Sequence, residues 1–163
     1  MSSSVETEYV QIVTLWRANC PVAAARRCFT DLGGPTFDRP QIPSPASITT
    51  SNRETKLAGA VWIRLQIDGI AGSAYQMGID PACKTRRIGS VTQHLYYPLG
   101  YGLDFVLPLV DSARAIFHRE SLSSGLIQFR DAEAPLMVEI PADTSAGWGR
   151  FDLENTYWVS EAI

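Results

Sequence analysis

Histidine is the residue type in this sequence best suited to acid–base chemistry near neutral pH, and the chain has two. His94 falls inside a predicted strand, and His118 falls near the end of a predicted helix. A carboxylate beside either ring, such as Asp104, Asp111 or Glu120, would give a general acid–base pair. The spacing requires no such pair, because a sheet face explains His94 and the helix dipole explains His118. We therefore assign no catalytic residue; the enzyme class stays open, with a non-enzymatic protein favoured.

Cysteine could supply a nucleophile or a metal ligand, and the sequence has three, namely Cys20, Cys28 and Cys83. Cys20 is the best placed, since it precedes a predicted helix whose N-terminus would favour the thiolate. An odd number of cysteines without a C-x-x-C pair predicts reduced thiols rather than a disulfide framework. A zinc site would need closely spaced cysteine and histidine ligands, which the sequence lacks. No metal and no cofactor are predicted.

Basic side chains form two short clusters that could bind phosphate, carboxylate or a nucleic-acid backbone. The clusters are Arg26 with Arg27, and Lys84 with Arg86 and Arg87. The alternative is a solvated turn, which we favour because the whole chain carries a net charge of −3. Nucleic acid is therefore kept as an alternative partner, and the charge predicts no attraction to an anionic membrane.

Aromatic side chains gather where two predicted strands meet a turn. Tyr96, Tyr97 and Tyr101 surround this turn. Two tryptophans in other predicted strands, Trp62 and Trp158, are added to this group. Tyrosine and tryptophan give a large, rigid contact area with a polar tip. We therefore predict that these five residues belong to an interface or line a pocket. Packing within the sheet is the alternative.

The clearest strand in the sequence covers residues 57–68, where Val61, Ile63, Leu65 and Ile67 recur at every second position. Similar patterns predict further strands at residues 9–17, 73–79, 88–97, 101–107, 126–130, 136–140 and 148–160. Apolar residues at helical spacing predict two short helices, at residues 21–32 and 108–120. Residues 33–52 are rich in Pro, Ser and Thr, which predicts an extended arm or long surface loop.

These elements predict a single β-rich domain over residues 1–163, because strands and helices do not alternate and no linker divides the chain. The predicted fold is mainly β: an antiparallel β-sandwich, with a jelly roll as one form, carrying two short helices in its loops. The alternative is an α+β fold in which a sheet curls around a helix, with a ferredoxin-like unit at its start.

The composition is that of an ordinary globular protein, with 45% hydrophobic and 19% charged residues. No apolar run approaches the roughly 18 residues of a membrane-spanning helix. The N-terminal residues MSSSVETEY have neither the basic nor the apolar region of a secretory signal. We therefore expect a location in the cytoplasm or in a virion, without membrane insertion.

Three classes of function fit these features. The favoured class is a non-enzymatic, self-assembling structural protein, such as a small viral capsid (coat) subunit that forms homo-oligomers or a shell. The strand-rich pattern, the Pro-rich arm and the low charge support it, and a shell subunit needs several apolar patches. The alternative is a small-molecule-binding β-barrel or curled-sheet protein, such as an isomerase or hydrolase. A module that captures a peptide at a sheet edge is the third.

Overall fold

A computed structural model describes residues 5–22, 28–30, 41–68, 74–77, 84–138 and 147–162. In this part of the chain the α-helices are α1 (Val5–Asn19), α2 (Arg53–Ala60) and α3 (Leu107–Ala115), with 3-10 helices at Pro45–Ser47 and Ser123–Gly125. The strands are β1 (Cys28–Thr30), β2 (Trp62–Asp68), β3 (Ala74–Met77), β4 (Lys84–Pro98), β5 (Ser121–Leu122), β6 (Ile127–Phe129), β7 (Leu136–Val138) and β8 (Trp148–Ala162).

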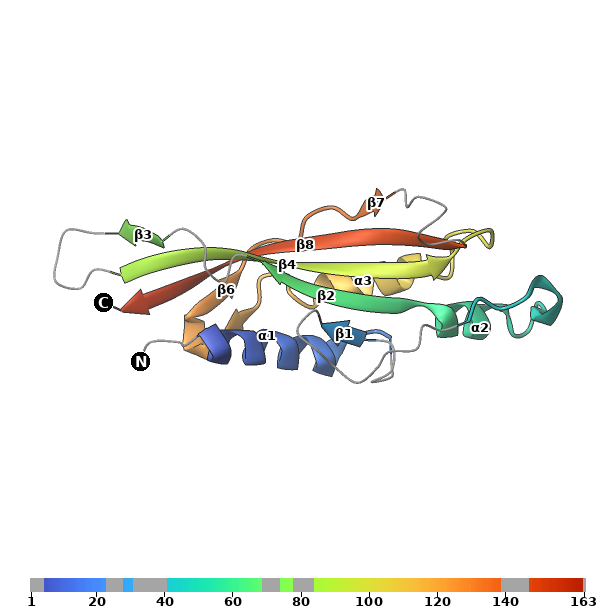
Figure 1. The fold of residues 1–163 in the computed structure, drawn as a ribbon, viewed down its shortest axis with the longest axis horizontal. Helices are drawn as coiled ribbons and strands as arrows, with labels where there is room; N and C mark the ends of the chain where they lie inside the picture. The colour runs from blue at the N-terminus through green and yellow to red at the C-terminus, as the bar shows by residue number, and fades with distance from the viewer. Residues whose placement is uncertain are drawn as a thin grey trace.

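The two fifteen-residue strands β4 and β8 form the centre of the sheet (Figure 1). They pair antiparallel along their whole length, from Lys84 opposite Ala162 to Pro98 opposite Trp148. The described strands form one sheet in the order β1-β2-β4-β8-β6-β5, with β3 also on β4 and β7 also on β8. At about 3.3 Å per residue, this ladder runs for roughly 45–50 Å.

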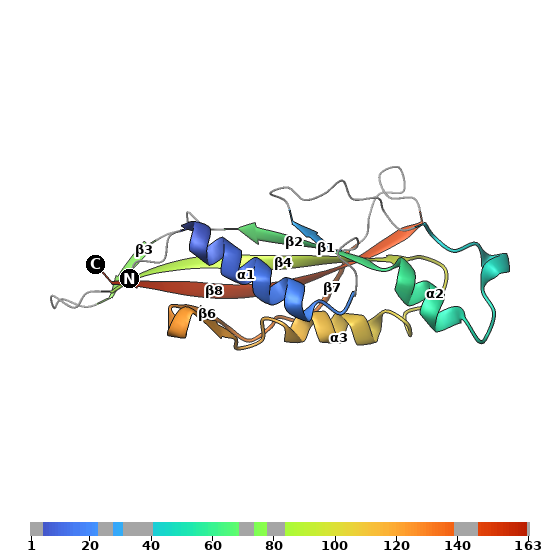
Figure 2. The ribbon, with the colours of Figure 1, turned by 90° about the horizontal axis from the view of Figure 1, so that it is seen from below.

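Helices α1 and α3 lie on the same face of the sheet, which we call the helix face (Figure 2). Alternate residues of the central strands point into this layer, because successive side chains of a strand face opposite ways. The main core residues from the sheet are Ile63, Leu65, Val91, Leu95, Phe151, Leu153, Tyr157 and Val159; those from the helical side include Ile12, Trp16, Val110, Ala113 and Phe117.

Buried Gln93 connects both helices to the sheet. The Trp16 indole Nε1 donates to Gln93 Oε1 at 3.0 Å, and Gln93 Nε2 donates to the backbone oxygen of Ala113 at 2.8 Å. Gln93 is 0% exposed, so leaving either amide group without a partner would cost its desolvation energy. The amide therefore favours one placement of α1 and α3 on β4.

Buried Glu8 makes a second connection between α1 and the sheet. Arg87 Nη2 of β4 donates to Glu8 Oε2 at 2.8 Å, and the Tyr157 hydroxyl of β8 donates to Glu8 Oε1 at 2.8 Å. A buried carboxylate is tolerated only when charge and hydrogen-bond partners compensate its lost hydration. The two donors satisfy that need and hold the N-terminal half of α1 on the sheet.

Two glycines give the central ladder room for tyrosine rings. Gly89 of β4 pairs with Tyr157, and Gly149 of β8 pairs with Tyr97. A Cβ at Gly89 would lie 2.5 Å from the Tyr157 ring, and one at Gly149 would lie 2.4 Å from the Tyr97 ring. Each ring thus occupies the space that a side chain would take. At Gly89 this brings the Tyr157 hydroxyl to Glu8.

The prediction of a strand at residues 9–17 was wrong, because this segment lies in α1. Tyr9, Ile12, Val13 and Trp16 are spaced i, i+3, i+4 and i+7, so they also form one helical face. Ile12, Val13 and Trp16 are buried and Tyr9 packs against the core. Loss of this strand also removes the start of the ferredoxin-like unit considered for the α+β alternative.

The helix predicted at residues 21–32 was wrong where the structure describes its C-terminal part. Cys28–Thr30 is β1, which pairs in parallel with Ile63–Leu65 of β2. Its strand conformation follows from this pairing, a tertiary contact that overrides local helical spacing. Residues 23–27 and 31–40 lie outside the described ranges.

The predicted strand at residues 101–107 was also wrong. Gly100 has φ 90° and Gly102 has φ 80°, a left-handed backbone that interrupts a strand. The chain turns here and enters α3 at Leu107, where Pro108 occupies the first helical turn. The predicted helix at 108–120 is confirmed as α3, although α3 ends at Ala115.

The remaining strand predictions are confirmed with shifted ends. The segment 57–68 contains β2, but its first residues belong to α2, which ends at Ala60. Val61, Ile63 and Leu65 are at most 1% exposed, as the alternation predicts. The other confirmed predictions are β3 in 73–79, β4 across 88–97, β6 in 126–130, β7 in 136–140 and β8 across 148–160.

At the level of fold class, the described residues combine one mostly antiparallel sheet with three α-helices. The sheet-rich prediction holds at this level. Of the predicted arm at 33–52, residues 41–52 are described and include the 3-10 helix Pro45–Ser47. The Tyr101 hydroxyl donates to the Pro43 oxygen at 2.7 Å, so this part of the segment contacts its own chain.

We predict that Gly89→Ala destabilises the protein by about 1–3 kcal/mol, because the new methyl group overlaps the Tyr157 ring. The measurement is the free energy of unfolding in urea. Ser90→Ala, at the next position and on the other face of β4, is the matched control and should change stability by less than about 0.5 kcal/mol. Equal effects of the two substitutions would contradict the proposed steric role of Gly89.

We predict that stability falls as pH rises above about 10. Burial raises the pKa of Tyr157 above its ordinary value of 10.0, and the Glu8 carboxylate raises it further. The unfolded state then loses this proton before the folded state does, so unfolding becomes easier by up to ~1.4 kcal/mol per pH unit.

Urea unfolding between pH 8 and pH 11 checks this dependence. Tyr157→Phe should reduce the slope, while the remaining slope reports Tyr97, whose pKa burial also raises. An unchanged slope in Tyr157→Phe would show that Tyr157 does not carry the effect.

Candidate functional site

The face of the sheet opposite α1 and α3 carries polar side chains in rows across the strands. We call it the open face and define it by Arg64 and Gln66 of β2, His94 of β4, and Arg150 and Asp152 of β8. Arg64 pairs with His94, and His94 pairs with Asp152. The same alternation that buries the helix face therefore aligns these polar side chains.

His94 is the centre of a hydrogen-bonded chain on the open face. Its Nδ1 lies 2.6 Å from Asp152 Oδ1, and its Nε2 lies 3.0 Å from Gln66 Oε1. Gln66 Nε2 donates to Asp68 Oδ2 at 2.8 Å, which orients the amide oxygen toward the ring. Both ring nitrogens therefore have a polar partner within hydrogen-bonding distance.

Arg150 extends this chain on the far side of Asp152. Arg150 Nη2 donates to Asp152 Oδ2 at 3.0 Å, and Arg150 Nε lies 2.9 Å from Asp152 Oδ1. The carboxylate therefore sits between a guanidinium and the His94 ring. Side chains of β2, β4 and β8 are connected in one row, which fixes their rotamers.

This geometry differs from the acid–base pairs considered from the sequence. The partner of His94 is Asp152, whereas Asp104 is bound by Arg53, whose Nη1 donates to it at 2.5 Å. That hydrogen bond lowers the pKa of the Asp104 carboxyl. A general base needs a ring nitrogen directed at its substrate, and both nitrogens of His94 already have partners. The arrangement connects strands rather than presenting a reactive group.

Three aromatic rings pack together on the open face, beside the row that contains His94. Trp62 and Tyr96 stack with centroids 3.8 Å apart and an interplanar angle of 7°. Trp148 meets Trp62 edge-on at 6.1 Å. Trp62 is 3% exposed, so this is a packed cluster in which Trp62 offers almost no surface to a ligand.

The remaining predicted aromatics lie elsewhere. Tyr97 points into the helix face, where its ring lies 5.4 Å from that of Phe151. Trp158 pairs with Ile88, eight positions before Tyr96 in β4, which places it roughly 25 Å away along the strand. The Trp158 indole Nε1 donates to Gln128 at 2.7 Å. The five aromatics predicted to share an interface or pocket therefore do not line one common pocket.

The basic cluster at residues 84–87 lies in β4 rather than in a turn. Arg87 donates to Glu8, and its side chain is only 12% exposed. Arg87 therefore binds a carboxylate of its own chain. Lys84 and Arg86 belong to the first residues of the strand, while Arg26 and Arg27 lie outside the described residues.

Cys20 is not at the start of a helix, as the sequence predicted, but follows the C-terminal end of α1. Cys20 forms no disulfide. The described residues contain no group of three or more His, Cys, Asp or Glu side chains placed to hold a metal ion.

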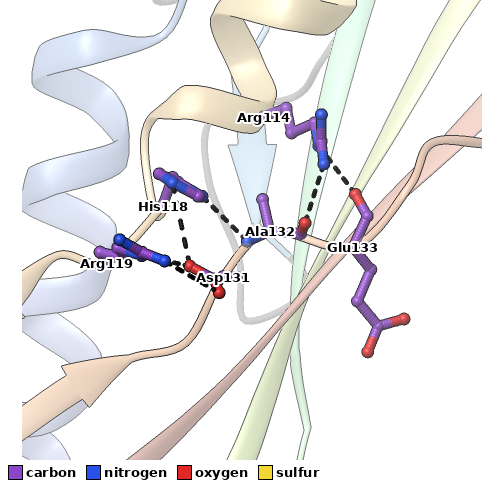
Figure 3. A network of polar contacts seen from close by, with 6 residues as sticks. All are labelled: Arg114, His118, Arg119, Asp131, Ala132 and Glu133. Carbon is purple, nitrogen blue, oxygen red and sulfur yellow. Dashed lines mark hydrogen bonds and ion pairs between the residues drawn. The ribbon is translucent and has the colours of Figure 1, made fainter.

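A polar network anchors the segment that leads into β7 to the end of α3 (Figure 3). Arg114 donates to the backbone oxygens of Ala132, at 2.9 Å, and of Glu133, at 2.8 Å. The Ala132 amide donates to His118 Nδ1 at 3.1 Å. Arg119 binds Asp131 and lowers the pKa of its carboxyl. His118 thus has a hydrogen-bonding role that the helix-dipole explanation did not include.

The anchored segment presents β7 at the border of the sheet. β7 pairs with residues 150–152 of β8, and no other described strand pairs with it. Leu136 is 63% exposed and Met137 is 54% exposed. Consecutive strand residues face opposite ways, so both sides of this short strand present an apolar side chain. The sequence predicted the strand but not its edge position, for which the preceding Pro135 is the one local signal.

No protein-family model matches the chain, and no curated protein matches it. Among the helices of the described residues, none is long and apolar enough to cross a membrane. The geometry of the open face and of β7 therefore carries the functional argument.

We predict that His94 and Asp152 stabilise the protein cooperatively. His94→Gln and Asp152→Asn should each lower the free energy of unfolding, and the double variant should lose less than the sum, with a coupling of about 0.5–3 kcal/mol. Urea unfolding of the four proteins at pH 6–7 measures this coupling. Thr92→Val, on the same face of β4, is the control for changed polarity. Additive effects of the two substitutions would contradict the proposed pair.

Proposed function

We propose that the protein is a non-enzymatic structural subunit that assembles with copies of itself, such as a coat subunit of a small virus. The observation that carries the proposal is the exposed pair Leu136 and Met137 on the edge strand β7. An edge strand offers unpaired backbone groups to another chain, and natural proteins usually protect such edges with charge. Two exposed apolar side chains at this edge favour association instead.

The anchoring of β7 supports this role. Because Arg114 and His118 hold the preceding segment, β7 is already ordered before a partner binds. Association then costs less conformational entropy, which raises the affinity available from a small contact. A rigid edge is what a repeating assembly needs, since each copy must repeat the same geometry.

Further exposed apolar side chains lie at separate places on the molecule. Val10 on α1 is 52% exposed, Leu99 beyond the end of β4 is 49% exposed, and Ile88 is 39% exposed. A closed shell or ring requires more than one contact surface on each subunit. The distribution of these residues supports several contacts per copy.

The sandwich or jelly-roll form of the fold is part of this proposal. It requires a second sheet packed on the first, which a neighbouring copy would supply in this proposal. A virion is the corresponding location. Nucleic acid is not required as a partner, because Arg87 already binds Glu8 and the chain is acidic overall.

We predict a native mass above the 17.9 kDa of one chain, rising with protein concentration. Sedimentation equilibrium or light scattering after size-exclusion chromatography measures it. Leu136→Lys should shift the population toward monomer, because it places a charge in the apolar contact. Ser112→Lys, at an exposed position of α3, is the matched control for added charge. A wild-type protein that stays monomeric at all concentrations would remove the proposed function.

A further inference from the structure

The contact between His118 and the backbone at Ala132 requires one protonation state of the ring (Figure 3). The Ala132 amide nitrogen lies 3.1 Å from His118 Nδ1, and a backbone N–H is a donor only. Nδ1 must therefore carry no proton, which leaves the single proton of the neutral ring on Nε2. A second proton, on Nδ1, would turn this acceptor into a donor and remove the hydrogen bond.

Asp131 offers the protonated ring another partner. His118 Nε2 lies 3.9 Å from Asp131 Oδ1, and within the described part of the chain this is the carboxylate within ion-pair distance of the ring. A hydrogen bond from Arg119 lowers the pKa of the Asp131 carboxyl, which stays ionised at mildly acidic pH. The neutral ring thus suits the Ala132 amide, and the charged ring suits Asp131.

The other charged groups around the ring are bound elsewhere or directed away. Arg119 opposes a charge on the ring, and its Nη2 donates to Asp131 Oδ2 at 3.3 Å. Arg114 of α3 donates to the backbone oxygens of Ala132 and Glu133. Figure 3 shows the Glu133 carboxylate directed away from the ring. The remaining charged residues of α3 and of the neighbouring segments are exposed and form no ion pair with His118; they are Asp111, Glu120 and Arg130.

Arg119, which follows the ring, has a strained backbone. Its φ is 57°, in the left-handed region that is unfavourable for residues with a side chain. Its amide donates to the Arg130 oxygen at 3.2 Å, and its side chain binds Asp131. The turn at His118 and Arg119 is therefore held by contacts with residues 130–132, not by its own preference. A charged His118 that competes for Asp131 weakens one of these contacts.

We propose that His118 and Asp131 form a pH-dependent anchor for the segment that leads into β7. At neutral pH the uncharged ring holds the Ala132 amide, while Arg119 holds Asp131. At mildly acidic pH, where histidine gains its second proton, the ring releases this amide and turns toward Asp131. Arg114 still holds the segment, so acidification loosens the anchor without unfolding the protein. The inference does not depend on self-assembly, because the anchor lies within one chain.

Amide hydrogen exchange at Ala132 tests the anchor in the wild-type protein. Protection, expressed relative to an unstructured peptide at the same pH, should fall about fivefold or more between about pH 7.5 and about pH 5.5. Mass spectrometry of peptides that contain Ala132 measures it. His118→Asn places a side-chain oxygen where Nδ1 stands, so it keeps an acceptor that does not titrate. This variant should retain its protection at both pH values.

Three further variants separate the anchor from other effects of pH. His118→Phe keeps a ring without an acceptor, so protection at Ala132 should be low at both pH values. His94→Gln removes the other histidine of the chain and should leave the response at Ala132 unchanged. Asp131→Asn should move the response to lower pH, because it removes the charge that attracts the protonated ring. Far-ultraviolet circular dichroism checks the fold of each variant.

Nuclear magnetic resonance gives a second test that needs no substitution. The imidazole signals of His118 and the amide signal of Ala132 should change with one common midpoint when the wild-type protein is titrated. Different midpoints would show that the ring does not control this amide, and would overturn the inference. Protection at Ala132 that is unchanged by pH in the wild type would also overturn it. So would an equal loss of protection in His118→Asn, since another group would then carry the response.

Discussion

Pairing between β4 and β8 determines where the rest of the chain can lie. Its register sets Gly89 opposite Tyr157, and only a residue without a side chain leaves space for that ring. The ring position then brings the Tyr157 hydroxyl to Glu8 of α1. A shift of one residue would turn Tyr157 to the open face and leave the buried carboxylate without this donor. Helix docking therefore depends on strand register.

Among the described residues, α1 and α3 cover one face of this ladder, and buried polar groups find their hydrogen-bond partners differently on its two faces. On the helix face, Gln93 and Glu8 are buried and need complete hydrogen bonding, which they obtain from both layers. On the open face, the His94 ring and the Asp152 carboxylate share one hydrogen bond within the sheet itself. Polar side chains there connect neighbouring strands directly, within the sheet.

Local pattern predicted the strands that bury alternate residues, because such strands alternate apolar and polar residues in the sequence. It failed where one set of apolar residues fits two periods: Tyr9, Ile12, Val13 and Trp16 satisfy a helix, while their β-rich composition suggests a strand. It also missed Asp152, since 58 residues separate this side chain from His94. The edge position of β7 depends on strand order, which local pattern does not encode.

Strands and helices differ in rise per residue, which explains why part of the central ladder lies beyond the described helices. A fifteen-residue strand extends for roughly 45–50 Å, whereas the fifteen residues of α1 extend for about 22 Å, because the rise per residue is about 3.3 Å in a strand and 1.5 Å in a helix. α1 and the shorter α3 are staggered along the ladder (Figure 2), and the end at which β4 begins and β8 ends extends past α1. The described helices are therefore too short to cover the whole length of these two fifteen-residue strands.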